Sequence, residues 1–160
     1  MKNKIYKSFT GTVMLIALFT TVGCKKYTEV EPVSQYSIPQ VFSDVSNATT
    51  ALVGVYDELQ GDNGYGIRIS MYYPYDSDEG IVSGNIDNGR RGVGRYQLLL
   101  TNSEIANPFR QLYRGVEKAN LCIEQIPLMP QYTSGSATDQ AILKRLHGEA
   151  LTLRAQFLFQ

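Results

Sequence analysis

Four of the tyrosines between Asp62 and Asn102 lie among Asp, Asn and Arg residues, in a stretch that is rich in glycine. Sugars present apolar C–H faces and a rim of hydroxyl groups, so a glycan site needs flat aromatic rings beside polar groups that form paired hydrogen bonds. We therefore predict a ligand-binding site made by Tyr72, Tyr73, Tyr75, Asp76, Asp78 and Tyr96. The alternative is that the tyrosine rings fill gaps beneath a long loop. Short strands are possible within this stretch at 67–73 and 96–101.

The same acidic residues raise two further possibilities, a calcium loop and a glycosidase. Asp76, Asp78 and Asp87 occupy positions one, three and twelve of an EF-hand pattern, but Ile81 stands where the sharp turn requires glycine. A glycosidase needs two carboxyl groups at a defined separation, which a sequence cannot supply. We expect no metal site, no catalytic residue and no cofactor, and we interpret the chain as a binding protein rather than an enzyme.

A helix is predicted before this loop, in the stretch that ends at Gly61. Ser43 or Asp44 can cap it, and the glycine can terminate it. Its apolar residues recur at helical spacing and form one buried stripe of Val45, Ala48, Leu52, Val55, Tyr56 and Leu59. Asp57 and Glu58 fall on the side expected to face solvent.

A second helix is predicted after the loop, with Asn107 as its cap and Pro108 in its first turn. One broad apolar face contains Phe109, Leu112, Tyr113, Val116, Asn120 and Ile123, widened by Ala119 and Ile126. Because an unpaired buried amide is costly, we expect Asn120 to bond a neighbouring backbone or side chain. Cys122 is expected to be a small packed residue rather than a nucleophile.

A third helix begins at Gln140, and its apolar arc is Ile142, Leu143, Leu146, Ala150, Leu153 and Phe157. After His147 nearly every side of this helix is apolar, and such a helix is surrounded by protein. Glu149 and Arg154 should therefore pair or bond carbonyl groups. Since the helix reaches Gln160 without a cap and too few partners cover it, we expect an N-terminal part of a longer protein.

The first residues have the organisation of a secretory signal. Lys2, Lys4 and Lys7 precede an apolar run over 9–22, which is shorter than the roughly 20 residues that span a bilayer. Gly23 and a cysteine then follow in the arrangement of a bacterial lipobox. The alternative is an ordinary secreted protein that is cut nearby and keeps a free cysteine.

Acylation of Cys24 would divide the chain into a lipoprotein signal peptide at 1–23, a tether at 24–41 and a helical domain at 42–160. Stable attachment to a membrane needs more than one acyl chain, a condition that bacterial lipoproteins meet. The whole chain carries 15 basic and 15 acidic residues, and removal of the signal would leave 12 basic against 15 acidic. We expect no nucleic-acid partner, because there is no basic field to neutralise phosphates.

The order of these features resembles the SusD/RagB family of outer-membrane lipoproteins. The opening helix matches the family through Phe42, Ala48, Ala51, Gly54, Tyr56 and Leu59. The second helix matches through Leu112, Tyr113, Ala119, Asn120 and Ile126, with Phe109 where tryptophan is usual. The phrase "GEALTLRAQFLF" matches through Gly148, Glu149, Ala150, Leu153, Arg154, Ala155 and Phe159.

The resemblance implies a mainly α fold of tetratricopeptide-like helical pairs that carry a long irregular loop region. Gly115 and Gly148 are separated by about one such repeat, which is roughly 34 residues. Gly54 lies inside the first helix at a cost of about 1 kcal/mol relative to alanine, so we expect a close helix neighbour there.

The resemblance also implies a function. The chain would be a lipoprotein on the outward face of the cell outer membrane, where it binds glycans or other nutrient oligomers and delivers them to a SusC-like TonB-dependent transporter. Two other classes stay open. One is a helical-repeat scaffold that binds protein partners only, and the other is a lipid-anchored glycoside hydrolase.

Overall fold

The structure is a computed structural model that describes residues 36–72, 75, 77–78 and 80–160. The chain divides into a unit of Met1–Tyr36 and a unit of Ser37–Gln160. Every helix described here belongs to the second unit. The predicted signal peptide and Cys24 lie outside the described residues. Within the described part, no helix combines the length and apolar character needed to cross a bilayer.

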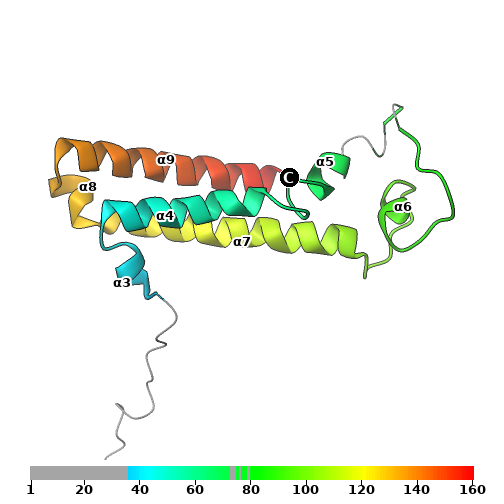
Figure 1. Cartoon of the computed structure of the whole chain (residues 1–160), viewed down its shortest axis with the longest axis horizontal. Coiled ribbons are helices and arrows are strands. Elements are labelled where there is room, and N and C mark those ends of the chain that lie inside the picture. The colour runs from blue at the N-terminus through cyan, green and yellow to red at the C-terminus, as the bar shows by residue number, and fades with distance from the viewer. Residues whose placement is uncertain (1–35, 73–74, 76, 79) are drawn as a thin grey trace, which may run out of the picture. The chain divides into compact units, whose positions relative to one another are not determined.

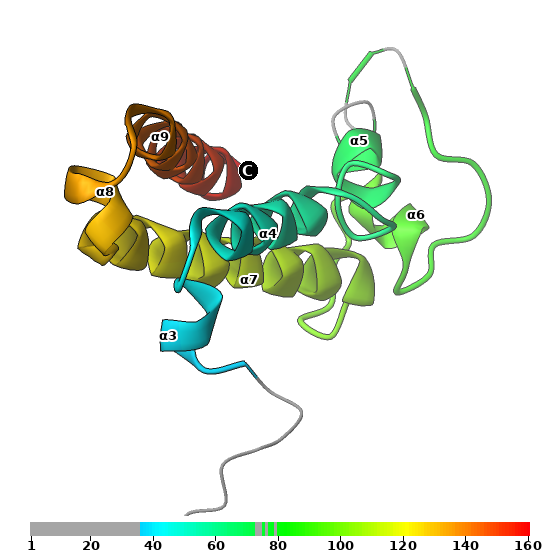
Figure 2. The same ribbon diagram turned by 60° about the vertical axis from the view of Figure 1, so that its left-hand side comes forward.

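Three helices make up most of the second unit: α4 (Val45–Tyr56), α7 (Ser103–Gln125) and α9 (Ala137–Phe159). Figures 1 and 2 show α4 beside α7, and α9 contacts both of these helices. Contacts of Gly115 with Phe157 and of Asn120 with Arg154 show that α7 and α9 run antiparallel. The predicted mainly α fold is confirmed, and no strand occurs among the described residues.

Six shorter elements complete the unit. They are α3 (Ile38–Val41), the 3₁₀ turn η1 (Asp57–Leu59), α5 (Arg68–Tyr72), α6 (Arg90–Val93), the 3₁₀ turn η2 (Ile126–Leu128) and α8 (Pro130–Ser134). Helix α5 occupies most of the segment where a strand was possible at 67–73. Helix α8 precedes α9, and α5 and α6 lie near the end of the unit where α7 begins (Figure 1).

The beginnings of the two long helices differ from the prediction. Helix α7 starts before Asn107, because Asn102 caps it by accepting a hydrogen bond from the Glu104 backbone N–H at 2.8 Å. Pro108 consequently lies inside the helix rather than in its first turn. Helix α9 also starts early, because the Ser136 hydroxyl accepts from a backbone N–H of its first turn. The cap of α4 is Asp44, one of the two residues predicted.

The core lies between α4, α7 and α9, and its buried apolar residues agree with two of the three predicted stripes. On α4 the buried side chains are Ala48, Leu52 and Val55, and on α9 they are Leu143, Leu146, Ala150, Leu153 and Phe157. Tyr56 departs from its stripe because it is exposed and donates its hydroxyl to Glu149 Oε2 at 3.2 Å. Glu149 also pairs with Arg145, so the predicted pairing of Glu149 is confirmed.

The buried face of α7 is rotated from the predicted one. Its buried residues are Pro108, Gln111, Gly115, Ala119 and Cys122. Phe109 and Tyr113, predicted to be central, are 57% and 54% exposed. The small residues line the approach to α9, because two helices pack closest where side chains are short. Asn120 is exposed rather than buried. Its amide oxygen accepts a hydrogen bond from Arg154 Nη1 at 3.0 Å, so each of these two residues has a polar partner of the kind predicted for it.

Glu58 was assigned to the solvent side of the first helix, and this was wrong. The chain changes from α-helix to the 3₁₀ turn at Asp57, and three residues per turn rotate Glu58 toward α7. Its carboxylate is buried and pairs with Lys118 Nζ at 2.6 Å and with Arg114 Nη2 at 3.3 Å. Gln111 Nε2 donates to the backbone oxygen of Glu58 at 2.7 Å. These polar contacts fasten the end of α4 to α7.

The close contact of α7 with α9 can be tested at Gly115. A Cβ atom added there would lie 2.5 Å from Cζ of Phe157, and real Cβ contacts are essentially never that short. We expect Gly115→Ala to lower the free energy of unfolding by about 1–3 kcal/mol, the usual cost of overpacking a core. Urea unfolding followed by circular dichroism measures this change.

Gly54→Ala and Gly148→Ala are matched controls, because an added Cβ meets nothing within 4 Å at either position. At Gly54 no neighbour lies where a Cβ atom would point, and the nearby contact from α7 is that of Lys118 Nζ, which donates to the Gly54 carbonyl at 3.3 Å. Both substitutions should raise the free energy of unfolding by up to about 1 kcal/mol through helix propensity. A Gly115→Ala protein as stable as the two controls would contradict the packing argument.

Candidate functional site

The segment between η1 and α7 folds back on itself around α6. Gly92 is essential to this turn, because an added Cβ would lie 2.6 Å from the Asp87 carbonyl oxygen and 2.9 Å from that of Gln97. The Gln97 N–H donates to the Gly92 carbonyl at 2.9 Å, and Arg95 Nε donates to the Val82 carbonyl at 3.0 Å. These bonds bring residues on both sides of α6 together.

A polar hollow of about 550 Å³ lies within this fold. Its lining consists of Tyr75, Gly80, Ile81, Val82, Ser83, Asp87, Arg90 and Arg91. Arg91 is held inside the segment, since its Nη1 pairs with Asp87 Oδ2 at 2.9 Å and its Nε donates to the Ser83 carbonyl at 3.1 Å. The hollow therefore combines one aromatic ring with a preformed cation–carboxylate pair.

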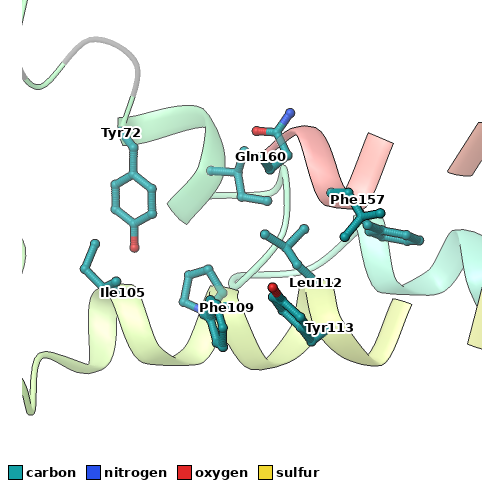
Figure 3. A pocket seen from close by; sticks show the side chains of 10 residues that line it. Tyr72, Ile105, Phe109, Leu112, Tyr113, Phe157 and Gln160 are labelled. Atoms are coloured by element: carbon teal, nitrogen blue, oxygen red, sulfur yellow. The ribbon is translucent and has the colours of Figure 1, made fainter. Parts of the chain in front are cut away.

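A second hollow of about 530 Å³ is apolar and is shown in Figure 3. It is lined by Ile69, Tyr72, Ile105, Pro108, Phe109, Leu112, Tyr113, Phe157, Leu158 and Gln160. The rings of Phe109 and Tyr113 lie 4.4 Å apart between their centroids. The Tyr72 hydroxyl is buried and has no hydrogen-bond partner among the described residues. This hollow suits an apolar ring or side chain better than a charged ligand.

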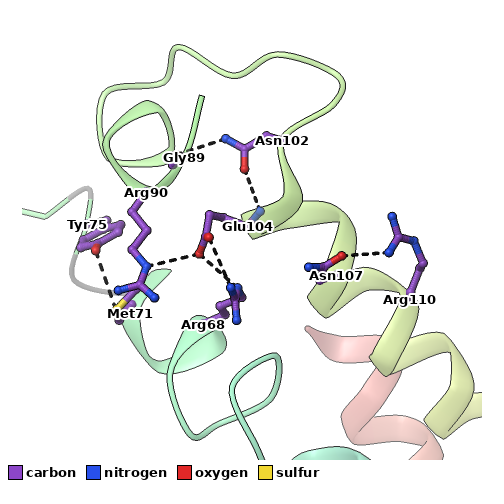
Figure 4. A network of polar contacts seen from close by, with 9 residues as sticks. All are labelled: Arg68, Met71, Tyr75, Gly89, Arg90, Asn102, Glu104, Asn107 and Arg110. Atoms are coloured by element: carbon purple, nitrogen blue, oxygen red, sulfur yellow. Dashed lines mark hydrogen bonds and ion pairs between the residues drawn. The ribbon is translucent and has the colours of Figure 1, made fainter. Parts of the chain in front are cut away.

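A cluster of charges joins the loop segment to α7 (Figure 4). The Glu104 carboxylate, in the first turn of α7, pairs with Arg68 Nε at 3.1 Å and with Arg90 Nε at 3.4 Å. Asn102 Nδ2 donates to the Gly89 carbonyl at 3.2 Å. The position of Arg90 at the polar hollow is thus tied to the beginning of α7.

Those predicted site residues that the structure describes do not all line the same hollow. Tyr72 lines the apolar hollow and Tyr75 lines the polar hollow. Tyr96 is 74% exposed with a φ of 52°, and neither it nor the exposed Asp78 lines either hollow. The predictions for Tyr73, Asp76 and Cys24 fall outside the described residues.

Some residues that were not predicted as site residues line the two hollows. Arg90 and Arg91 have side chains that are 50% and 49% exposed, and both line the polar hollow. Their position before a tight glycine turn is a signal that could have suggested this. Phe109 and Tyr113 were assigned to the core, and only the shift in the buried face of α7 brings them to the apolar hollow.

The Cys122 thiol and the His147 ring both pack against other parts of the protein. Cys122 is 2% exposed, and burial raises the pKa of its thiol to about 11, so the prediction of a packed residue is confirmed. The His147 ring lies edge-on to Tyr132, with 6.3 Å between the ring centroids. Within the described residues, no group of three His, Cys, Asp or Glu side chains could hold a metal ion.

Comparison with known proteins gives one informative similarity. The chain is 27% identical over 153 residues to SusD-like protein P38 of Formosa agariphila. The alignment covers 95% of this chain but only 28% of the length of P38. No family model matches the chain, and no solved structure matches it. The name of this relative agrees with the resemblance to the SusD/RagB family that the three helix phrases carry.

The Tyr72 hydroxyl gives a prediction about pH. Burial raises the pKa of Tyr72 to about 12 from an ordinary value of 10, and the nearby Glu104 charge adds to this. Because the folded state keeps this proton after the unfolded chain has lost it, the contribution of Tyr72 to stability is complete below pH 10 and declines as the pH rises to 12. Tyr72→Phe should therefore lose less stability over that interval than the wild type.

The measurement is the urea midpoint between pH 9 and 12. Tyr96→Phe is the matched control, since that ring is exposed, and it should follow the wild-type curve. At neutral pH Tyr72→Phe should be at least as stable as the wild type, because it removes a buried hydroxyl that has no partner among the described residues. If Tyr72→Phe loses stability as steeply as the control, the hydroxyl is not buried in solution.

Proposed function

We propose that the chain functions as a SusD-like binding lipoprotein of the cell outer membrane, which captures glycans or other nutrient oligomers for a SusC-like TonB-dependent transporter. The observation that carries this proposal is the polar hollow, where the Tyr75 ring lies with Asp87, Arg90 and Arg91 around about 550 Å³. The volume lies within the range of small-molecule sites, roughly 300–1,000 Å³.

The chemistry of this hollow fits a sugar ring. The Tyr75 ring supplies a flat face for C–H groups, while the Asp87–Arg91 pair offers an acceptor and donors to neighbouring hydroxyl groups. Since that pair is already formed, little side-chain ordering remains to oppose binding. Glycan binding needs no chemical step, so the chain acts as a binding protein rather than as an enzyme.

The proposed location rests on the N-terminal sequence. Acylation of Cys24 after signal cleavage would anchor the chain, and Lys25 rather than aspartate follows the cysteine, which suits retention in the outer membrane. The similarity to a SusD-like protein supports the same assignment. A transporter partner would then lie in the same membrane and take up the captured oligomer.

A second candidate function, binding of protein partners only, is favoured by the exposed apolar rings of Phe109 and Tyr113. It predicts that the polar hollow is not used for sugars. The two functions therefore give opposite results in a sugar-binding assay.

Binding can be measured by native electrophoresis in gels that each contain one soluble polysaccharide: β-glucan, xylan, pectin or λ-carrageenan. We expect at least one of them to retard the wild type. Tyr75→Ala and Arg91→Gln should each weaken that retardation about tenfold, because each removes a contact worth roughly 1–2 kcal/mol. Isothermal titration with oligosaccharides from the same polymer gives the affinity.

Arg110→Gln is the matched control, because Arg110 is an exposed arginine on α7 that bonds Asn107 and lines neither hollow. It should bind the polysaccharide like the wild type. Retardation that is unaffected by both hollow substitutions would exclude the polar hollow as the site. If no polymer retards the wild type while co-purification recovers protein partners, the second function holds.

Acylation gives an independent prediction. Cells that express the full chain should incorporate labelled palmitate into it, and globomycin should cause a longer precursor to accumulate. Cys24→Ala should abolish the label, whereas Cys122→Ala, which changes a buried thiol, should retain it. Equal labelling of wild type and Cys24→Ala would contradict the lipid anchor.

A further inference from the structure

We propose that Glu104 is the positioning residue of the polar hollow: its carboxylate holds α5 and α6 against the first turn of α7 and thereby sets the place of the Arg90 guanidinium. This inference rests on the proposed function, since it concerns the same hollow. Glu104 itself does not line the hollow, so it acts through Arg90.

The geometry of the carboxylate is the first line of evidence. Oε2 lies 3.1 Å from Arg68 Nε and 3.4 Å from Arg90 Nε, while Oε1 accepts from Arg68 Nη2 at 3.3 Å. The side chains of Glu104 and Arg68 are 12% and 14% exposed, whereas that of Arg90 is 50% exposed. A carboxylate so removed from water needs its cationic partners. Arg68 is the buried partner, and Arg90 is the one that reaches the hollow.

The backbone beside Arg90 is held from the same place. Asn102, which is 2% exposed, caps α7 with its side-chain oxygen and donates from Nδ2 to the Gly89 carbonyl, immediately before Arg90. Helix α6 has only four residues, and a helix so short has little stability of its own. Its position is therefore decided by contacts with the start of α7.

The two arginines of the hollow are held in different ways. Arg91 pairs with Asp87 inside the loop segment, so that pair moves with the segment. Arg90 is fixed from outside the segment by Glu104. Loss of the Glu104 charge should consequently release Arg90 and α6 from α7 while the Asp87–Arg91 pair stays formed.

The test is a double-mutant cycle of Glu104→Gln, Arg90→Gln and the double variant in the full chain, read by hydrogen–deuterium exchange of peptides from residues 88–101. Each single substitution should speed exchange there about tenfold, the ratio expected for losing one charge-assisted hydrogen bond. The double variant should be no faster than Glu104→Gln, because both changes break the same contact. Glu117→Gln, an exposed glutamate on α7, should leave exchange unchanged.

Arg90→Gln keeps the Arg68–Glu104 pair, so it reports on the loop contact even if Glu104→Gln lowers the global melting temperature. Unchanged exchange in Arg90→Gln, or effects of the two substitutions that multiply, would overturn the positioning role. In the polysaccharide gels, Glu104→Gln and Arg90→Gln should weaken retardation by similar factors. If none of the four polymers retards the wild type, the proposed function fails, while the exchange experiment still decides the role of Glu104.

Discussion

The contact of the Phe157 ring with the bare backbone of Gly115 fixes the distance between α7 and α9. A Cβ atom at Gly115 would lie 2.5 Å from Phe157 Cζ, and α7 buries the small residues Gly115, Ala119 and Cys122 while its larger apolar residues lie on its flanks. The exposure of Phe109 and Tyr113 follows directly from this choice. The close approach at Gly115 thus accounts for the small residues that α7 contributes to the core and for the position of Phe109 and Tyr113 at the apolar hollow.

Much of the fold follows from sequence periodicity, and its failures have physical causes. The stripes of α4 and α9 were predictable, because large aliphatic residues such as Leu52 and Leu146 recur at helical spacing. Such a stripe on one side of a helix is buried against the core. On α7, hydrophobicity predicted that the aromatic rings would be buried, whereas close packing of the helices buries the small residues instead. Glu58 was misplaced because a local change from α-helix to 3₁₀ turn cannot be read from apolar spacing.

The candidate site was less predictable than the fold. Composition drew attention to the segment between η1 and α7, and Tyr75 lines a hollow there. Tyr72 and Tyr75 are three residues apart, yet they line different hollows, because α5 ends at Tyr72. The ion pairs of Arg90 and Arg91 join residues that are separated by loops, and no sequence period encodes such contacts.

A hollow built on a loop segment that contains only short helices keeps its shape only if something rigid supports it. The long helix α7 supplies that support, because its 23 residues are packed against α9 and its first turn offers both a cap and a carboxylate to the loop. Binding energy then does not have to order the segment first, which would reduce affinity. If the chain is anchored and paired with a transporter as proposed, its confinement near that transporter would raise its effective concentration there without any new contact. Under the proposed function, a site of modest affinity that is held in place by one helix terminus would suffice for capture and release.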